Sequence, residues 1–344
     1  MAKATIDDVA KLAGVSIKTV SRVVNHESNV RESTRATVKK AIAQLNYRPN
    51  LSARNLASHR ARLVGLIYDD PTAYDVPSGG YVMRLQQGAL RACRSAHFEL
   101  FIHPCNYRDE NLGRELAELV DEVRPSGIVI AAPLSNMPEI VAAIEATGTR
   151  LVRLSPGETR TQDFSIGTND REVCAEMTRY LASLGHERIA FITGHPQHNA
   201  VANRFLGYKD GLQESGLEFS ERLVARGDNS VGSGEACAKK LLQLESPPTA
   251  IFAANDDMAA GVMRLAARRR IDVPGQLSIA GCDDFAFAQQ IYPELTTISQ
   301  PLPAMAEQAA LAIINDGKNL SARSGVEVIP GQLQIRRSTG PAPG

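Results

Sequence analysis

The fold of the N-terminal segment is decided by the stretch Thr5-Ile6-Asp7-Asp8-Val9-Ala10-Lys11-Leu12-Ala13-Gly14-Val15-Ser16-Ile17-Lys18-Thr19-Val20-Ser21-Arg22-Val23-Val24-Asn25. The apolar residues before Gly14 have the spacing of one helix face, and a second apolar set follows that glycine. Thr5 with Asp8 resembles a capping box, and Ser16 is a good N-cap for a second helix. Gly14 can take the positive φ that ends a helix within one residue. Two short helices around a glycine turn predict a helix-turn-helix.

The second helix would carry a polar outer face that suits contact with DNA. Arg22 can donate two parallel hydrogen bonds to a guanine edge, worth about 1–3 kcal/mol of discrimination. Thr19, Ser21 and Asn25 are short hydrogen-bonding side chains suited to phosphate oxygens. Ile17 and Lys18 lie at the helix end that usually meets base edges in this motif. The motif alone also allows an ordinary three-helix bundle with a solvated polar face.

The distribution of charge favours the DNA-binding interpretation. Residues 1–60 hold eleven Lys and Arg against four Asp and Glu, a difference of +7. Because the whole chain has a formal net charge of +0, residues 61–344 carry −7. Such asymmetry is typical of a nucleic-acid-binding segment attached to a neutral-to-acidic body, and binding to a polyanion would depend strongly on salt.

Further sequence blocks follow in order along nearly the whole chain, at residues 47–50, 53–56, 184–192, 204–208, 248–256, 273–281 and 293–301. Together with the first stretch they resemble the lac repressor (LacI–GalR) family of bacterial transcription regulators. The resemblance implies a sequence-specific repressor of carbohydrate uptake or catabolism genes, released from its operator by a small sugar-like effector. Some members need a co-repressor instead, so the sign of the effect stays open. A cytosolic sugar-binding sensor or carrier that does not bind DNA is the alternative.

The resemblance also implies that residues 47–58 act like the family's hinge, a short helix in the minor groove at the operator centre. Residues 50–58 are fewer than the about 12–15 that a helix needs to be stable alone, so this arm would need DNA or a second hinge. Leu56 matches the leucine that wedges between base pairs, although a flexible linker with one exposed leucine is the alternative. The predicted DNA contacts are Thr5, Ser16, Ile17, Lys18, Thr19, Ser21, Arg22, Asn25, Asn50, Ala53 and Leu56.

One departure from the family lies at the start of the third helix. Arg31 stands where many relatives have a serine cap. Either Ser33 takes over the capping or the cap is missing, which would cost about 1 kcal/mol.

From residue 63 strand-like and helical stretches alternate in two series, which predicts two lobes with parallel sheets covered on both faces. The first series has strands at 63–67, 99–103, 127–132 and 150–154, with helices at 83–95, 110–122 and 138–146. The second has strands at 188–193, 222–225, 250–254 and 277–281, with helices at 172–184, 204–214, 234–244 and 258–269. The predicted fold class is α/β, with a small all-α helix-turn-helix head and a two-lobed body like periplasmic sugar-binding proteins, as the resemblance implies.

The predicted domains follow from these assignments. Residues 1–48 would form the helix-turn-helix DNA-binding domain, 49–61 the hinge helix and linker, and 62–344 the effector-binding and dimerisation domain. Lobe 1 would span about 62–160 and 293–321, and lobe 2 about 162–291 and 322–338.

A cleft for a polyol needs amides, carboxylates and arginine near the carboxyl ends of strands. Family correspondence points to Arg204 as a donor to ring hydroxyls, and to Asn255 and Asp283, which also stand where helix N-caps belong. The predicted effector contacts are Asp69, Asp70, Tyr74, Arg204, Asn229, Asn255 and Asp283.

The residues after Gly227-Asp228 depart from the family, because relatives often carry an aromatic residue where Asn229 follows this pair. The chain also has no tryptophan. Phe205, Phe285, Tyr74 or Tyr81 could supply the stacking wall instead. The resulting expectation is a polar-lined or larger pocket, suited to a disaccharide or glycoside.

Several classes of protein are disfavoured by what the sequence lacks. We find no phosphate loop, no nucleophile elbow and no Cys-x-x-Cys, so we expect neither an enzyme nor a cofactor. His195 and His198 lie close together without an evident third ligand, so we expect no metal. Residues 1–10 have no signal-peptide pattern, and no apolar run approaches the length of a membrane span. The five scattered cysteines are typical of a reducing compartment, so we expect a cytoplasmic protein without a membrane partner.

The expected partners are a pseudo-palindromic double-stranded DNA operator, a small-molecule effector, and a second copy of the chain. Two heads would read adjacent major grooves about 34 Å apart. Ligand-dependent lobe closure would alter the spacing of the hinges, and a coupling of about 1–3 kcal/mol would change DNA affinity about 5–150-fold. No apolar heptads follow Arg336, so the tetramerising tail of some relatives is not expected.

Overall fold

The computed structural model describes residues 4–24, 29–47, 62–70, 80–156, 164–195, 199–315 and 324–344. It divides into two compact units, Met1–Ala61 and Arg62–Gly344, which we call the head and the body.

The head is a three-helix bundle of α1 (Ile6–Ala13), α2 (Ile17–Val24) and α3 (Glu32–Gln44). The capping box is confirmed, because the Asp8 amide donates to Thr5 Oγ1 and the Thr5 amide donates to Asp8 Oδ2. Gly14 ends α1 with φ +65°, in the left-handed region. The Thr19 amide donates to Ser16 Oγ at 3.2 Å, as expected of an N-cap. Helix α3 starts after Arg31 without a side-chain cap, so the second of the two alternatives is correct. The core of the bundle consists of Val9, Ala10, Val20, Val23, Val38 and Ala41.

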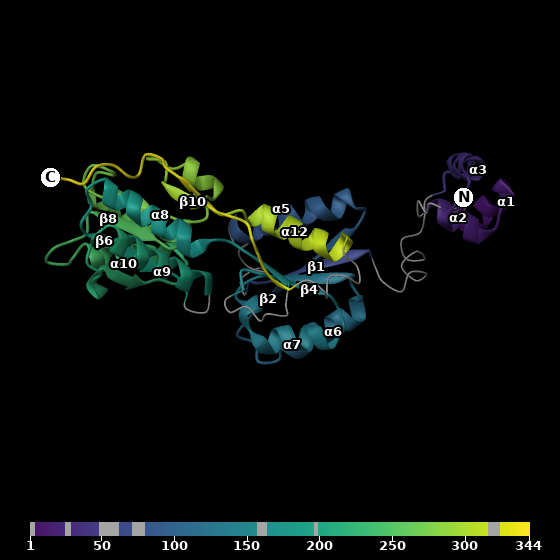
Figure 1. Ribbon diagram of the computed structural model, residues 1–344, viewed down its shortest axis with the longest axis horizontal. Helices are drawn as coiled ribbons and strands as arrows, with labels where there is room; N and C mark the ends of the chain where they lie inside the picture. The colour runs from purple at the N-terminus through teal and green to yellow at the C-terminus, as the bar shows by residue number, and fades with distance from the viewer. Residues whose placement is uncertain are drawn as a thin grey trace. The chain divides into compact units, whose positions relative to one another are not determined.

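The first lobe of the body is built on a six-stranded parallel sheet, in the order β11-β5-β4-β3-β1-β2. Its strands are β1 (Leu63–Asp69), β2 (Glu99–Cys105), β3 (Gly127–Ile130), β4 (Leu151–Leu154), β5 (Phe164–Gly167) and β11 (Gly325–Val328). Helices α5 (Gly80–Ser95) and α12 (Leu302–Asn315) cover one face (Figure 1). The other face is covered by α6 (Leu112–Val123), η1 (Leu134–Asn136) and α7 (Pro138–Ala146). Each face has its own apolar core, which explains why the strands are apolar without alternation.

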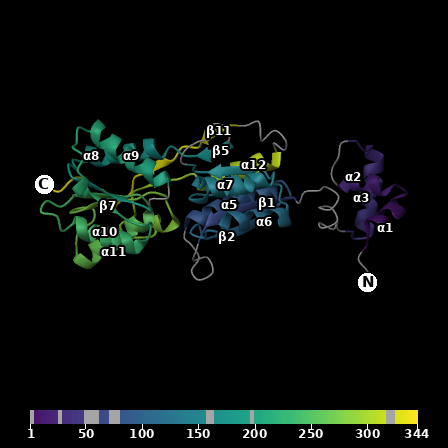
Figure 2. The same cartoon turned by 90° about the horizontal axis from the view of Figure 1, so that it is seen from below.

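The second lobe has a four-stranded parallel sheet in the order β7-β6-β8-β9. Its strands are β6 (Ile189–Thr193), β7 (Val224–Arg226), β8 (Ala250–Ala253) and β9 (Ser278–Ala280). Helices α8 (Asp170–Ser183) and α9 (Asn199–Glu214) lie on one side, and α10 (Val231–Leu241) and α11 (Asp256–Arg269) on the other (Figure 2). Short 3-10 turns are η2 (Glu221–Leu223), where the predicted strand 222–225 begins, and η3 (Ala286–Gln289). Helices α10 and α11 cross closely at Gly234, where a Cβ atom would lie 2.1 Å from the Met258 carbonyl oxygen.

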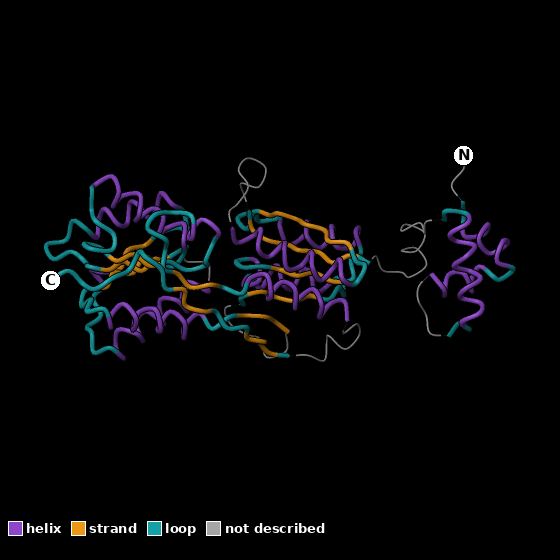
Figure 3. Tube along the Cα trace, turned by 90° about the horizontal axis from the view of Figure 1, so that it is seen from above, coloured by secondary structure: helices purple, strands orange, loops and turns teal. Residues whose placement is uncertain are grey.

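Three segments join the two lobes, and they run side by side (Figure 3). The chain crosses after β5, again between β10 (Thr297–Ser299) and α12, and finally between β11 and β12 (Gln332–Gln334). Strands β10 and β12 pair with each other, Ser299 opposite Gln332. The Gly331 amide donates to Asn169 Oδ1 at 2.8 Å, which ties the last crossing to the first.

The predicted lobe boundaries need correction at these crossings. Strands β5 and β11, which we expected in lobe 2, extend the sheet of lobe 1, because β5 pairs in parallel with β4 and β11 pairs in parallel with β5. Residues 293–299, which we expected in lobe 1, pack on lobe 2, where Leu295 and Ile298 are buried in its core. Among the described residues, no helix is long and apolar enough to cross a membrane.

Candidate functional site

A cavity of about 220 Å³ lies between the two lobes, at the carboxyl ends of their strands. Lobe 1 lines it with Asp69, Gly80, Tyr81, Val82, Ala132 and Ser155. Lobe 2 and the second crossing line it with Ala200, Val201, Arg204, Asn229, Asn255, Asp257, Asp283, Phe285 and Gln300. Parallel α/β folds bind small ligands at this edge of the sheet, so we treat this cavity as the candidate ligand site and call it the cleft.

Five of the predicted effector residues meet in the cleft, namely Asp69, Arg204, Asn229, Asn255 and Asp283. Asp70 is not among the lining residues; it is buried, and its amide donates to the Cys105 carbonyl. Tyr74 lies outside the described residues.

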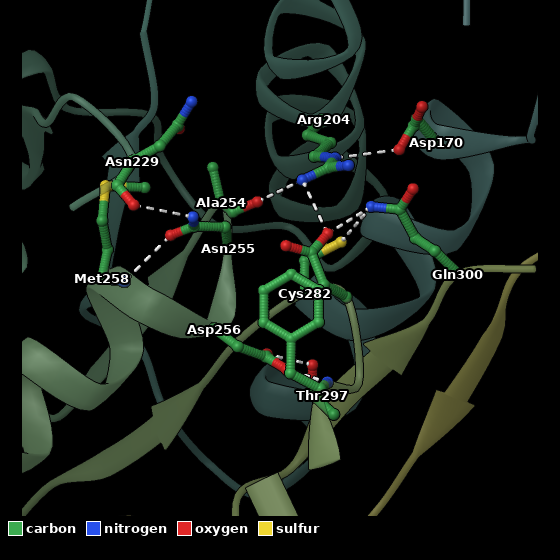
Figure 4. Close-up of polar contacts among 12 residues, drawn as sticks. Asp170, Arg204, Asn229, Ala254, Asn255, Asp256, Met258, Cys282, Thr297 and Gln300 are labelled. Carbon is green, nitrogen blue, oxygen red and sulfur yellow. Dashed lines mark hydrogen bonds and ion pairs between the residues drawn. The ribbon is translucent and has the colours of Figure 1, made fainter. Parts of the chain in front are cut away.

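Arg204 lines the cleft and is paired with two buried carboxylates, Asp170 (Figure 4) and Asp283. Its Nε donates to Asp170 Oδ1 at 2.9 Å, and its Nη1 lies 3.5 Å from Asp283 Oδ1 and also donates to the Ala254 carbonyl. The three charged side chains are each 8% exposed or less. Burial raises the pKa of both carboxyls, while the arginine beside them acts in the opposite direction. Arg204 is therefore mainly the counterion of this cluster.

Asn255 both caps a helix and faces the cleft. Its Oδ1 accepts from the Met258 amide at 2.9 Å, and its Nδ2 donates to the Asn229 carbonyl at 3.0 Å (Figure 4). Asn229 in turn has φ +72°, and its Oδ1 accepts from the His195 amide at 3.3 Å. Asp283 does not cap a helix, and instead its Oδ1 accepts from Gln300 Nε2 at 2.5 Å.

Some lining residues were not predicted from the sequence. Ser155 follows β4 and Asp257 is two residues beyond Asn255, so the same strand-end rule could have found both. Gln300 follows β10, a strand that we did not predict. The role of Asp170 as a partner of Arg204 could not be predicted, because the two residues lie 34 positions apart and no local sequence pattern links them.

The aromatic residues of the cleft are Tyr81 and Phe285. Burial raises the pKa of the Tyr81 hydroxyl. Phe205 is wrong as a candidate for the stacking wall, since its ring packs against Phe191 at 5.7 Å and Phe219 at 6.1 Å in the core of lobe 2.

The described lining of the cleft is more acidic than basic. Asp69, Asp257 and Asp283 contribute three carboxyls, and Arg204 is already paired with Asp170 outside the cleft. Burial raises the pKa of Asp69 and Asp257, so each carboxylate is costly unless it accepts hydrogen bonds. A hydroxyl-rich ligand can donate those bonds, whereas an anionic ligand would be repelled.

In the head, α2 presents Ile17, which is 48% exposed, together with exposed Lys18. Ser21 and Arg22 are half-buried on the same helix, while Val20 and Val23 face the core as predicted. The Ser16 and Thr19 hydroxyls lie 2.9 Å apart, and Thr5 belongs to the capping box. The other predicted DNA contacts, Asn25, Asn50, Ala53 and Leu56, lie outside the described residues. Within the part of the chain that is described, no three His, Cys, Asp or Glu side chains form a metal-binding group.

Comparison with known proteins gives matches to both units. The model of bacterial regulatory proteins, lacI family, matches residues 5–50, and that of the periplasmic binding protein-like domain matches residues 178–339. The transcriptional regulator GalR of Escherichia coli K12 is 34% identical over 309 residues, which cover 89% of this chain and 87% of that protein. Catabolite control protein A of Priestia megaterium is 31% identical, with 97% and 99% covered. The lac repressor dimer bound to operator and the anti-inducer ONPF superposes with a TM-score of 0.80 and 27% identity, with 98% and 100% covered. The CelR–cellobiose complex has a TM-score of 0.74 and 26% identity, with 97% and 99% covered.

Proposed function

This chain belongs to the lacI family of bacterial regulatory proteins, and we propose that a small ligand in its cleft controls how its head holds operator DNA. It is a DNA-binding transcriptional regulator, which sets aside the alternative of a carrier that ignores DNA. The single observation that carries the ligand-dependent part is the cleft, lined by carboxylate and amide side chains, between two lobes joined by three crossings. A ligand bound to both lobes stabilises one lobe arrangement over another by its difference in affinity for the two.

The proposed ligand is an uncharged, hydroxyl-rich molecule such as a sugar or glycoside. Asp69 and Asp257, from opposite lobes, would accept hydrogen bonds from its hydroxyls, and Asp283 would add a third acceptor. Asn229 and Asn255 would contribute amide groups, and Tyr81 and Phe285 would supply apolar contact with the ring faces. A sugar phosphate or a sugar acid fits poorly, because the only described cation in the lining is already paired.

The proposed DNA contacts divide by the chemistry of the side chains. Ile17, Lys18 and Arg22 on α2 would meet base edges, while the hydroxyls of Thr5, Ser16, Thr19 and Ser21 would meet phosphate oxygens. Asn25 and the hinge residues Asn50, Ala53 and Leu56 stay predictions from the family resemblance.

The function is tested by selecting genomic DNA fragments with the full-length protein at low ionic strength. We expect a small set of fragments to be enriched and one sugar of a panel to release them, or to strengthen binding if it is a co-repressor. That sugar is expected to be recovered chemically unchanged, because we propose binding without catalysis. The panel pairs neutral sugars with their phosphates and acids, and only the neutral members should act. Failure to retain any fragment, with or without sugars, would contradict the function, and release by a sugar phosphate alone would contradict the ligand class.

The body also has exposed apolar side chains that we propose as part of a dimer surface. Met83 (65% exposed) and Leu90 (37%) lie on α5, and Ile102 (41%) lies on the edge strand β2, which α5 contacts. Replacing both Met83 and Leu90 with glutamate should weaken the dimer at least tenfold, or about 1.4 kcal/mol, measured by sedimentation equilibrium. Leu206→Glu, at a residue that is 39% exposed on α9, is the matched control and should leave the association constant unchanged. Equal effects of the two substitutions would argue against this surface.

A further inference from the structure

Arg84 of lobe 1 reaches across to the main chain of lobe 2. Its Nη1 donates to the carbonyl oxygens of Asp283 at 2.7 Å and Asp284 at 2.9 Å. Its Nη2 donates to the carbonyl oxygen of Gln300 at 3.1 Å. The planar guanidinium has five donors in a fixed fork, so one side chain can hold three carbonyl oxygens at once.

The turn that Arg84 holds has an unfavourable backbone conformation. Asp283 has φ +127° and Asp284 has φ +54°. Both values lie in the positive-φ half of the Ramachandran map, which residues other than glycine rarely adopt. Such conformations persist only where the surroundings hold them, and they are frequent at ligand sites. This turn directs the Asp283 carboxylate toward Arg204 and Gln300 at the cleft.

Side chains of lobe 2 also hold residues 284 and 285. Arg336 Nη2 bonds to Asp284 Oδ1 at 2.5 Å, and Asp256 Oδ2 accepts from the Phe285 amide at 2.9 Å. Of these three side chains, Arg84 is the one that comes from lobe 1. The start of α5 also abuts this turn, because a Cβ atom at Gly80 would lie 2.4 Å from the Phe285 ring.

We propose that Arg84 is a positioning residue for the ligand site, which holds the 283–284 turn so that the Asp283 carboxylate faces the cleft. The proposal deepens the proposed function and rests on it in one respect, that Asp283 binds the ligand. It adds that α5 of lobe 1 sets the geometry of a binding group in lobe 2. Movement of α5, which also carries Met83 and Leu90, is thereby coupled to the cleft.

Among the described residues, Arg84 bonds to neutral carbonyl oxygens and to no carboxylate. Its removal therefore leaves no uncompensated buried charge, and the expected consequence is a looser turn in a folded body. This distinguishes Arg84 from Arg204, whose removal would leave buried carboxylates without their counterion.

The test compares hydrogen exchange in full-length Arg84→Met, Arg84→Lys and Arg91→Met. We expect Arg84→Met to accelerate exchange of peptides spanning 283–285 and 298–301 at least tenfold, while those spanning β6 exchange as before. Arg84→Lys should be intermediate, because lysine keeps the charge and some donors but not the fork. Arg91→Met removes an exposed arginine from the same helix and should change neither region. No acceleration in Arg84→Met, or equal acceleration in β6, would overturn the proposal.

Ligand binding supplies the second readout. Arg84→Met should bind the panel sugar that acts on the unaltered protein at least tenfold more weakly, with Arg84→Lys again between the two. If Arg84→Met accelerates exchange in the turn but binds that sugar normally, the positioning role is wrong. If the unaltered protein binds no sugar, the proposed function fails, while the exchange experiment still decides whether Arg84 holds the turn.

Discussion

Arg204→Met is expected to destabilise the body by about 3–5 kcal/mol. The substitution leaves Asp170 and Asp283 buried without the guanidinium that pairs with both. Both carboxyls already have raised pKa values from burial, and loss of the arginine would raise them further. The native state of the variant then binds more protons than its unfolded state, so its stability falls as the pH rises. The difference from the unaltered protein should therefore be larger at pH 8 than at pH 5.5. Urea unfolding of the body at the two pH values measures it.

Two further variants identify the cause of this loss. Arg204→Met combined with Asp170→Asn removes one of the stranded charges and should recover part of the stability. Arg171→Met breaks an exposed ion pair, in which the Arg171 side chain is 57% exposed and that of Asp210 is 30% exposed. This substitution should lower the free energy of unfolding by no more than about 1 kcal/mol. A loss in Arg204→Met as small as that in Arg171→Met, or one independent of pH, would show that the buried cluster is not what Arg204 stabilises.

Val20→Asp is expected to abolish specific DNA binding and leave the body intact. Val20 is 0% exposed in the core of the head, which holds six buried residues in the described part of that unit. An unpaired carboxylate there costs several kcal/mol, which is a large share of the stability of so small a domain. We expect at least a hundredfold loss of affinity for a selected fragment, measured by fluorescence anisotropy in the presence of competitor DNA. The competitor is needed because an unfolded head keeps its positive charge and still binds DNA without sequence preference.

Ile17→Ala provides the matched comparison on the same helix. Ile17 is 48% exposed, so alanine should leave the head folded and weaken only the contacts to specific bases. Helical circular dichroism should therefore fall in Val20→Asp and not in Ile17→Ala. Specific binding that survives Val20→Asp would show that the three-helix core is not required for DNA recognition.

Local patterns predicted much of the fold from the sequence. The capping box at Thr5 and Asp8, the glycine turn and the inward valines of the head all depend on residues within one or two helical turns. The alternation of strands and helices in the body is equally local, since a buried strand and an amphipathic helix each have their own periodicity. The ends of these elements shifted by only a few residues.

Non-local pairing explains what the sequence did not predict. Strand β5 is four residues long and β11 lies far along the chain, and they join the first sheet only because β5 pairs with β4 and β11 pairs with β5. Strand β10 has only three residues, so the residue that follows it, Gln300, was missed. At the cleft, the family resemblance pointed to Asn255, Asp283 and Arg204, but the main role of Arg204 depends on Asp170, which lies 34 residues earlier on another helix.

The three crossings between the lobes have a consequence for how such regulators diversify. The head is one contiguous segment, Met1–Ala61, so a single recombination event after it can transfer DNA specificity between two genes. Neither lobe is contiguous, because each is assembled from stretches separated by the other. Exchanging one lobe would require a breakpoint at each of the three crossings. Chimaeras of this protein with its relatives should therefore tolerate an exchanged head far better than an exchanged lobe, and new effector specificity should arise mainly by point substitution around the cavity.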